Sequence, residues 1–315
     1  MCSFMRGDEC NEIRTLLNDM LDKIVKPERL NLLIRIDEQP ILPNHYVCVF
    51  NASEVAVILN ENPYVSKSRG LYEYLIKIYQ FKKIMDGFNF ISNLNKEEKI
   101  VKNVIKKFEP ELKTIADAAS GNLFYAIDEL NSFISSNINI MVANLIVSEN
   151  IKSEKLASII KSQFHSEVNK RRGNNLEHKS LDEIELNKNI RITRRNTEKF
   201  EKRSKNHLYK LVGKIDGFNE NENCVIEVKN RLNKKEALPF YDYIQCIVYM
   251  RLTNTKKCNL YECYSDGFKN ETLIEWNQTC FDNIDTKLTE FVNFVRRITK
   301  NDLHSLVRKY HEEYV

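Results

Sequence analysis

The sequence predicts an α+β protein: a mixed, partly antiparallel β-sheet flanked by helices and preceded by a largely helical lobe. Two kinds of apolar spacing support this class. From residue 71 to about residue 170, apolar side chains recur every three or four positions, which is typical of helices. Strand-like runs then cover residues 208–218, 224–230, 259–264 and 272–276.

The length of the chain allows two parts. With 315 residues and 42% hydrophobic content, it can bury a sizeable core. We expect a lobe at 1–165 and a core at 166–315, sharing a cleft because no linker rich in Gly, Pro or Ser divides them. In the lobe, the spacing predicts an amphipathic opening helix over residues 11–24. It also predicts a series of helices with breaks near Asn93, Pro110, Gly121 and Asn137.

Composition favours a soluble intracellular protein. No run reaches the roughly 18 apolar residues of a membrane span, and the first residues lack a signal-peptide core. The apolar tract from Leu123 to Val147 contains Asp128 and Glu129, so we expect core burial first and a partner surface second. The eight cysteines form no Cys-x-x-Cys pair. This argues against zinc and iron–sulfur sites, and free thiols indicate a reducing compartment, cytoplasm or nucleus.

The candidate catalytic residues lie between residues 210 and 229. Asp216 stands in a Gly-Lys-Ile-Asp-Gly turn, and Glu227-Val228-Lys229 follows eleven residues later. We expect residues 208–218 and 224–230 to pair as a hairpin that brings Asp216 beside Glu227. On the second strand Glu227 and Lys229 share one face, predicted to line a cleft, while the apolar residues between them face the core.

Two neighbouring carboxylates repel each other unless a cation neutralises them, and oxygen donors suit magnesium, with manganese able to substitute. Lys229 would place a positive charge where water or a scissile phosphate sits. In a chain with 29% charged residues, however, a Glu-x-Lys also arises by accident.

Two helices extend this site. Pro239 begins a helical run to Thr253 in which Gln245 and Tyr249, four apart, share a face. Upstream, Gly173 and Glu177 begin a helical run that continues over residues 174–186, and Glu177 offers a third carboxylate. Tyr241, Asp242 and Tyr243 leave two interpretations open, stacking on bases or filling the helix surface.

In this order, Gly173-x-x-x-Glu177, Asp216, Glu227-x-Lys229 and Gln245-x-x-x-Tyr249 resemble the motifs of the PD-(D/E)xK nucleases. The resemblance is greatest to the phage lambda exonuclease-like (YqaJ-type) branch, whose Ala-Ser-Glu helix ending near Asn-Pro-Tyr is similar to residues 51–64 here. It covers roughly residues 46–85 and 168–266. It implies a restriction-endonuclease-like core and a Mg²⁺-dependent 5′-to-3′ exonuclease acting on double-stranded DNA in viral-type recombination, replication or repair.

The same resemblance implies roles for single residues. Asp216, Glu227, the Val228 carbonyl and Glu177 would hold the metal, Lys229 would assist the attacking water, and Gln245 and Tyr249 would hold Lys229 and the DNA. A possible single-strand annealing partner and a homo-oligomer also follow from the family, whereas nothing indicates a membrane partner.

Two departures from the family pattern affect these expectations. Ile215 replaces the motif proline, which supplies no ligand. Residues 45–50 lack the arginine that, with the motif serine, holds a 5′-phosphate in the family. Ser53, in the first turn of a helix that Asn51 and Glu54 would cap, is the remaining phosphate candidate. Lys67 and Arg69 are candidate substitutes for the missing charge.

Residues 188–214 carry ten Lys or Arg against two acids and lead into the hairpin. Arg194 and Arg195 in this stripe are candidate DNA contacts, although a charge run is also typical of a solvated face. Two further function classes stay open. One is a structure-selective endonuclease or RNA nuclease on the same fold. The other is a non-catalytic nucleic-acid-binding protein.

Overall fold

The computed structural model describes residues 42, 46–65, 67–78, 96–121, 126–149, 151–264, 266–267, 269–299, 302 and 305. The helix predicted over residues 11–24 and the break near Asn93 lie outside these residues. The chain divides into two compact units, Val47–Phe291 and a second formed by Met1–Tyr46 with Val292–Val315. All predicted site residues belong to the first unit, and the α+β class is confirmed for it.

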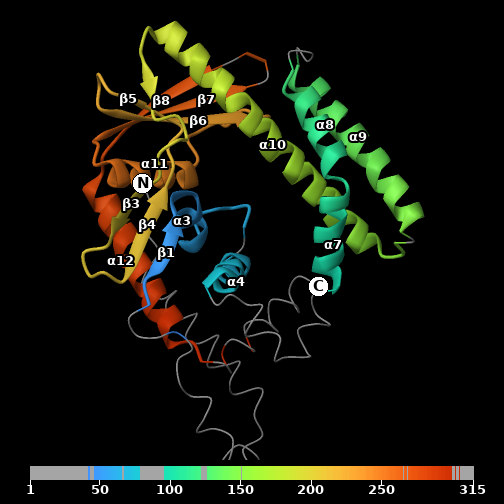
Figure 1. Cartoon of the computed structure of the whole chain (residues 1–315), viewed down its shortest axis with the longest axis horizontal. Coiled ribbons are helices and arrows are strands. Elements are labelled where there is room, and N and C mark those ends of the chain that lie inside the picture. The colour runs from blue at the N-terminus through green and yellow to red at the C-terminus, as the bar shows by residue number, and fades with distance from the viewer. Residues whose placement is uncertain are drawn as a thin grey trace, which may run out of the picture. The chain divides into compact units, whose positions relative to one another are not determined.

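The larger sheet has five strands, of which β5 to β8 are labelled in Figure 1. Its strands, in spatial order, are β2 (Ile192–Thr193), β5 (Gly217–Asn219), β6 (Cys224–Arg231), β7 (Lys257–Tyr264) and β8 (Lys269–Glu275). β6 and β7 run parallel, and the other neighbours run antiparallel. The connection between β6 and β7 is α11 (Phe240–Thr253), which begins after Pro239 and ends at Asn254 in the left-handed conformation, with φ 61°. Prediction and structure agree on this helix.

A smaller sheet has the order β1 (Cys48–Asn51), β4 (Tyr209–Gly213), β3 (Phe200–Arg203), with β1 and β4 parallel. The predicted single strand over residues 208–218 is therefore wrong, because the chain leaves the smaller sheet after Gly213 and enters the larger one at Gly217. Helix α3 (Ala52–Ile58) follows β1, begins with the predicted Asn51 to Glu54 bonds and packs against α11. Two further helices are α4 (Lys67–Ile78) and α12 (Gln278–Arg297), and α12 extends beyond Phe291.

Gly213 lies where three elements meet. A Cβ added there would lie 2.9 Å from Tyr249 Cε1 and 3.2 Å from the Ala52 Cβ. Both distances are closer than side chains normally approach, so the absence of a side chain allows the end of β4 to pack against α3 and α11. This close packing sets the distance between the smaller sheet and the helix that carries Gln245 and Tyr249.

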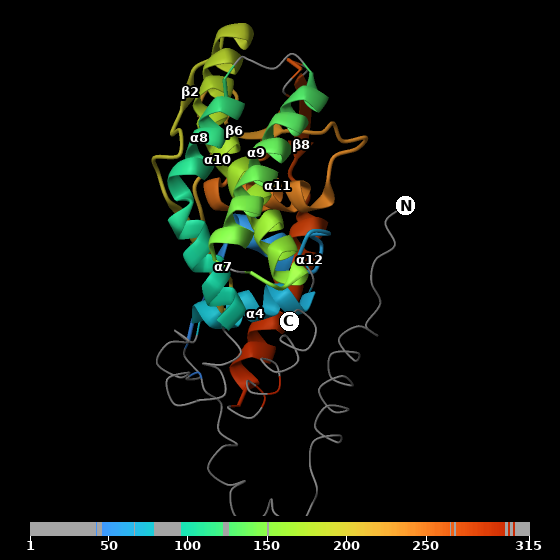
Figure 2. The same cartoon turned by 90° about the vertical axis from the view of Figure 1, so that its right-hand side faces the viewer.

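Four helices form a separate apolar cluster, seen side by side in Figure 2: α7 (Lys96–Lys107), α8 (Glu109–Ala119), α9 (Ile127–Ser148) and α10 (Glu154–Lys188). The predicted breaks near Pro110 and Gly121 are confirmed. The break at Asn137 is wrong, because its side chain donates to the Phe133 carbonyl and α9 continues. α10 begins at Glu154, capped by Ser153, well before the predicted start at Gly173.

α10 joins the helical cluster to the larger sheet. Its first half packs on α7, α8 and α9, and it also contacts β6. The predicted boundary between residues 165 and 166 falls inside this helix.

By length and composition α9 is the one helix in the described part of the chain that would suit a membrane span. One face of it is nevertheless buried in the helical cluster, through Leu130, Ile134, Ile138, Met141, Val142 and Leu145. This packing accounts for the apolar tract in the way that the sequence favoured. Ile140 and Val147 are exposed on the same helix.

Both faces of β6 are covered. Ile226 and Val228 pack with Leu181 and Ile184 of α10, as predicted for the apolar face. The opposite face, which carries Glu227, was expected to line an open cleft. Instead α11 covers it, and Glu227 is 1% exposed. The carboxylate therefore lies in a low-dielectric environment, and this determines the chemistry of the site.

Candidate active site

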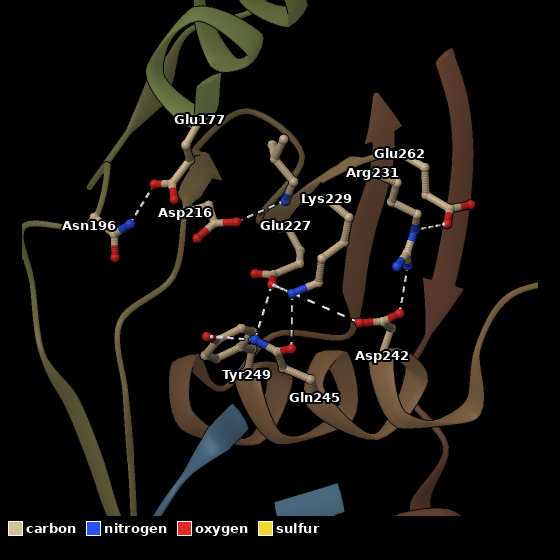
Figure 3. Close-up of polar contacts among 11 residues, drawn as sticks. Glu177, Asn196, Asp216, Glu227, Lys229, Arg231, Asp242, Gln245, Tyr249 and Glu262 are labelled. Atoms are coloured by element: carbon tan, nitrogen blue, oxygen red, sulfur yellow. Dashed lines mark hydrogen bonds and ion pairs between the residues drawn. The ribbon is translucent and has the colours of Figure 1, made fainter. Parts of the chain in front are cut away.

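Asp216 lies immediately before β5, next to Glu227 of β6. Gly217 pairs with Ile226, so Asp216 stands opposite Glu227 one step beyond the ladder, as the hairpin interpretation predicted. Asp216 Oδ2 accepts a hydrogen bond of 2.8 Å from the Val228 amide (Figure 3). In an extended strand the amide and carbonyl of one residue point to the same side. The Val228 carbonyl is therefore directed to the side of β6 on which Asp216 lies, as its predicted role as a ligand requires.

The carboxylates of Asp216 and Glu227 both have raised pKa values. Burial, followed by the charges of Glu227 and Glu177, raises the pKa of Asp216 well above its ordinary value. Burial also raises the pKa of Glu227, although the adjacent Lys229 opposes this rise. One oxygen of Glu227, Oε2, is buried without a hydrogen-bond partner among the described residues. A buried oxygen of this kind is costly unless it has a partner.

These observations fit a hard divalent cation. The candidate donors are the free oxygen of Glu227, the Asp216 carboxylate and the Val228 carbonyl, all of which are oxygen atoms. Among the described residues no three Asp, Glu, His or Cys side chains lie together as a ready ligand set. The fit therefore rests on the Asp216 and Glu227 pair with one backbone carbonyl, and water would complete the coordination.

Glu177 reaches the site from α10. Its charge acts on Asp216, and Figure 3 shows the two carboxylates near each other. Its Oε1 accepts a short hydrogen bond from the Asn196 side-chain amide. Asn196, whose backbone amide also bonds to the Ile215 carbonyl, was missed by the sequence analysis. Its left-handed φ of 49° in a turn before the hairpin is characteristic of asparagine, but the sequence carried no signal for the bond to Glu177.

The side chain of Gln245 organises the other side of Glu227. Its Oε1 accepts from Lys229 Nζ, and its Nε2 donates to Glu227 Oε1 and to the Tyr249 hydroxyl, each at 3.0 Å. Lys229 Nζ itself lies 2.6 Å from Glu227 Oε1. The structure thus brings together the four residues that the motifs selected from β6 and α11. Burial would lower the pKa of Lys229, but Glu227 and the other acids outweigh it and the pKa is raised. Lys229 stays an ammonium.

A buried charge network continues from Lys229 along the face of β6. Asp242 Oδ1 lies 3.9 Å from Lys229 Nζ, and its Oδ2 accepts from Arg231 at 2.6 Å. Arg231 Nε also donates to Glu262 Oε1 on β7 at 2.5 Å (Figure 3). Arg231 and Glu262 were missed by the sequence analysis, and Asp242 was left undecided. The alternation from Glu227 through Lys229 was a usable signal, because it places Arg231 on the same face.

Two arginines of the basic stripe, Arg194 and Arg195, are held in ion pairs with acids of this chain. Arg194 lies 3.2 Å from Glu220 Oε1 and over the Phe218 ring. Arg195 binds Asp182 and Glu185, the latter at 2.5 Å. These pairs give both arginines a structural role, and their predicted contact with DNA stays a prediction.

The phosphate candidates near α3 are also only partly described. Ser53 is exposed in the first turn of α3, and the neighbouring Glu54 pairs with Lys77 at 2.6 Å. Lys67 and Arg69 fall in the first turn of α4, and their side chains lie outside the described residues. Their role in binding phosphate stays a prediction.

Comparison with known proteins gives structural likenesses. No family model and no curated protein sequence matches the chain. The alkaline exonuclease LHK-Exo of Laribacter hongkongensis is 13% identical, with 64% of this chain and 92% of that chain covered and a TM-score of 0.34. A phage-related exonuclease of Haemophilus somnus 129PT is 13% identical over 52% and 80%, with a TM-score of 0.33. The protein SSO0001 is 16% identical over 50% and 72%, with a TM-score of 0.33.

Proposed function

We propose that this chain is a metal-dependent deoxyribonuclease that hydrolyses phosphodiester bonds. The observation that carries the proposal is the buried arrangement of Asp216, Glu227 and Lys229. In the described part of the chain Glu227 Oε2 lacks a partner, while its other oxygen binds the lysine. A stable protein rarely buries two acids side by side without a use for them. A site for a divalent cation next to a fixed ammonium supplies that use.

Each residue of this cluster has its own proposed role. Asp216, Glu227 and the Val228 carbonyl would hold Mg²⁺ or Mn²⁺, with Glu177 acting directly or through water. When bound, the cation supplies Lewis-acid stabilisation of the phosphate and a more acidic bound water. Lys229 provides a positive charge to a phosphate oxygen or orients the attacking water. Although burial lowers the pKa of Lys229, the surrounding acids raise it above its ordinary value.

Gln245 fixes the direction of Lys229. Its amide accepts from the lysine and donates to Glu227 and Tyr249, so the side chain has one favourable orientation. Tyr249 is buried and holds the amide from the far side. Positioning of this kind reduces the entropy lost on reaching the transition state.

The polarity, substrate and biological role of the nuclease are proposed from the motif resemblance. The order of the motifs and the Ser53 segment support a 5′-to-3′ exonuclease on linear duplex DNA, acting in viral-type recombination, replication or repair. A single-strand annealing partner, a homo-oligomer and an intracellular location are further parts of the proposal. The Asn51 to Glu54 bonds that begin α3 support the helix start at which Ser53 would meet an end phosphate.

The test is digestion of linear duplex DNA with and without a 5′-phosphate, beside closed circular DNA, in Mg²⁺. Wild type is compared with Lys229→Ala and with Lys257→Ala, a control that removes an exposed lysine at the start of β7. We expect loss of the linear DNA alone, abolished by Lys229→Ala and unchanged by Lys257→Ala. Preference for a 5′-phosphate would support the Ser53 pocket.

Two results would contradict parts of the proposal. Cutting of the closed circle would contradict the exonuclease activity and indicate an endonuclease. Binding without cutting in either Mg²⁺ or Mn²⁺ would indicate a non-catalytic binder or an enzyme for RNA.

A further inference from the structure

Two tyrosines and a lysine, from two loops and the start of α11, lie together at the surface. Tyr64 follows α3 in the Asn-Pro-Tyr segment and is 65% exposed. Lys235 lies between β6 and α11, and Tyr241 lies in the first turn of α11. We call Tyr64, Lys235 and Tyr241 the aromatic trio.

Contacts between the two loops hold the trio together. Lys235 Nζ donates to the Tyr64 hydroxyl at 2.8 Å and lies 5.5 Å from the centre of the Tyr64 ring. The rings of Tyr64 and Tyr241 meet edge to face, with centroids 5.9 Å apart and an angle of 76° between planes. Tyr64 is therefore fixed on both sides although most of its surface remains in water.

Two residues, Arg231 and Asp242, connect the trio to Lys229. The charge of Arg231 acts on the Tyr241 hydroxyl, and Arg231 binds Asp242 at 2.6 Å. Asp242 in turn lies 3.9 Å from Lys229 Nζ. Tyr241, Arg231 and Asp242 therefore form a chain of neighbours between Tyr64 and Lys229, so the trio lies on the Arg231 side of the site.

Folding alone does not account for these features. A single exposed aromatic is common on a protein surface. Here a second ring and an ammonium hold the exposed ring in one orientation, at the edge of a site that handles phosphodiesters. Rigid aromatic faces beside cations are how proteins bind unpaired bases and the phosphates between them. Inside a duplex no base face is free, because the bases stack on each other, whereas every base of a single strand can offer one.

We propose that the aromatic trio is a stacking platform for an unpaired base of the DNA strand, adjacent to the phosphate at Lys229. Tyr64 contacts the face of the base, Tyr241 supports Tyr64, and Lys235 contacts the neighbouring phosphate. The site takes single-stranded DNA with little sequence preference, since every base has a face to stack. This inference rests on the proposed function for its location, but it concerns binding and can be measured without hydrolysis.

The experiment measures binding of a fluorescein-labelled 12-nucleotide single strand by anisotropy, in EDTA so that no metal supports cleavage. A second probe has the same backbone with abasic positions. The variants are Tyr64→Leu, Tyr64→Phe and Lys235→Gln. Phe240→Leu is the control, since Phe240 is 46% exposed at the same helix start but stacks on Tyr243 outside the trio. Thermal melting shows that each variant is folded.

We expect Tyr64→Leu to weaken binding of the intact strand by about 5- to 100-fold, the loss typical of one stacked base. Binding of the abasic strand should change little. Tyr64→Phe should bind like wild type because it keeps the ring, and Lys235→Gln should weaken both probes and reduce their salt dependence.

Three results would overturn the platform. These are unchanged binding by Tyr64→Leu, an equal loss on both probes with that variant, and an equal loss with Phe240→Leu. Failure of the nuclease proposal is distinguishable. A wild type that binds through Tyr64 but never cuts keeps the platform and loses the catalysis. If wild type cuts DNA and Tyr64→Leu still binds the single strand normally, the nuclease proposal stands and the platform fails.

Discussion

Replacing Asp216 by asparagine should stabilise the metal-free protein. Asparagine retains an oxygen for the Val228 amide but removes the charge that faces Glu227. Neighbouring strands lie about 5 Å apart, and two like charges at about 5 Å repel by about 3 kcal/mol at an effective dielectric constant of about 20. Lys229 offsets part of this repulsion, so we expect a gain of about 2 kcal/mol. In a domain of about 150–250 residues, a gain of this size raises Tm by about 4–8 °C.

The assay is thermal unfolding in EDTA and in Mg²⁺. In Mg²⁺ the wild type should gain stability, since a ligand that binds the folded state shifts the equilibrium toward it. Asp216→Asn should gain much less. Glu222→Gln, which removes an exposed acid from the turn before β6, is the matched control and should behave like wild type.

The same prediction has a pH dependence. The pKa of Asp216 is raised in the folded state, so folding favours its protonated form. Without metal, wild-type stability should therefore fall as pH rises from the unfolded pKa, about 3.9, through the raised folded value. Asp216→Asn should lack this part of the fall. A lower Tm for Asp216→Asn in EDTA, or no effect of Mg²⁺ on wild type, would refute the electrostatic reasoning.

Three further predictions concern packing and the charge network. Gly213→Ala should lose about 1–3 kcal/mol in urea unfolding because its Cβ would meet Tyr249 at 2.9 Å, whereas Gly173→Ala, with no heavy atom within 4 Å of the added Cβ, should gain about 0.5–1 kcal/mol. The reverse order would contradict the packing. Gln245→Leu should lower the single-turnover cleavage rate at least tenfold, because Lys229 and Glu227 lose their common partner. An unchanged rate would remove Gln245 from the site. Arg231→Met should cost about 3–5 kcal/mol of stability by leaving Asp242 and Glu262 buried without their cation, and a loss below 1 kcal/mol would show that the two acids are not held by it.

The hairpin and α11 were predictable because their signals are local. Alternation along residues 224–230 selected the two faces of β6, and the turn formers at residues 219–223 set the pairing of Asp216 with Glu227. The spacing of four between Gln245 and Tyr249 placed both on one helix face. Local periodicity and turn chemistry are sufficient for such elements.

Other features depended on contacts distant in sequence. The change of sheet between Gly213 and Gly217 follows from packing against α3 and α11, which no local pattern encodes. The covered face of β6 was taken as a cleft because charged residues usually face water, whereas here Glu227 is buried with Lys229 as its partner. Arg231 and Glu262 meet through the parallel pairing of β6 with β7. The sequence of either strand alone does not predict the register of this pairing.

The most direct test of the account is release of mononucleotides from linear duplex DNA in Mg²⁺ by wild type and by Glu227→Gln. The substitution keeps the size of the side chain and removes the charge that would hold the cation. The account predicts steady release by wild type and none by the variant, with the variant still folded by thermal melting. Release at the same rate by both proteins would contradict the assignment of this buried cluster as the catalytic centre.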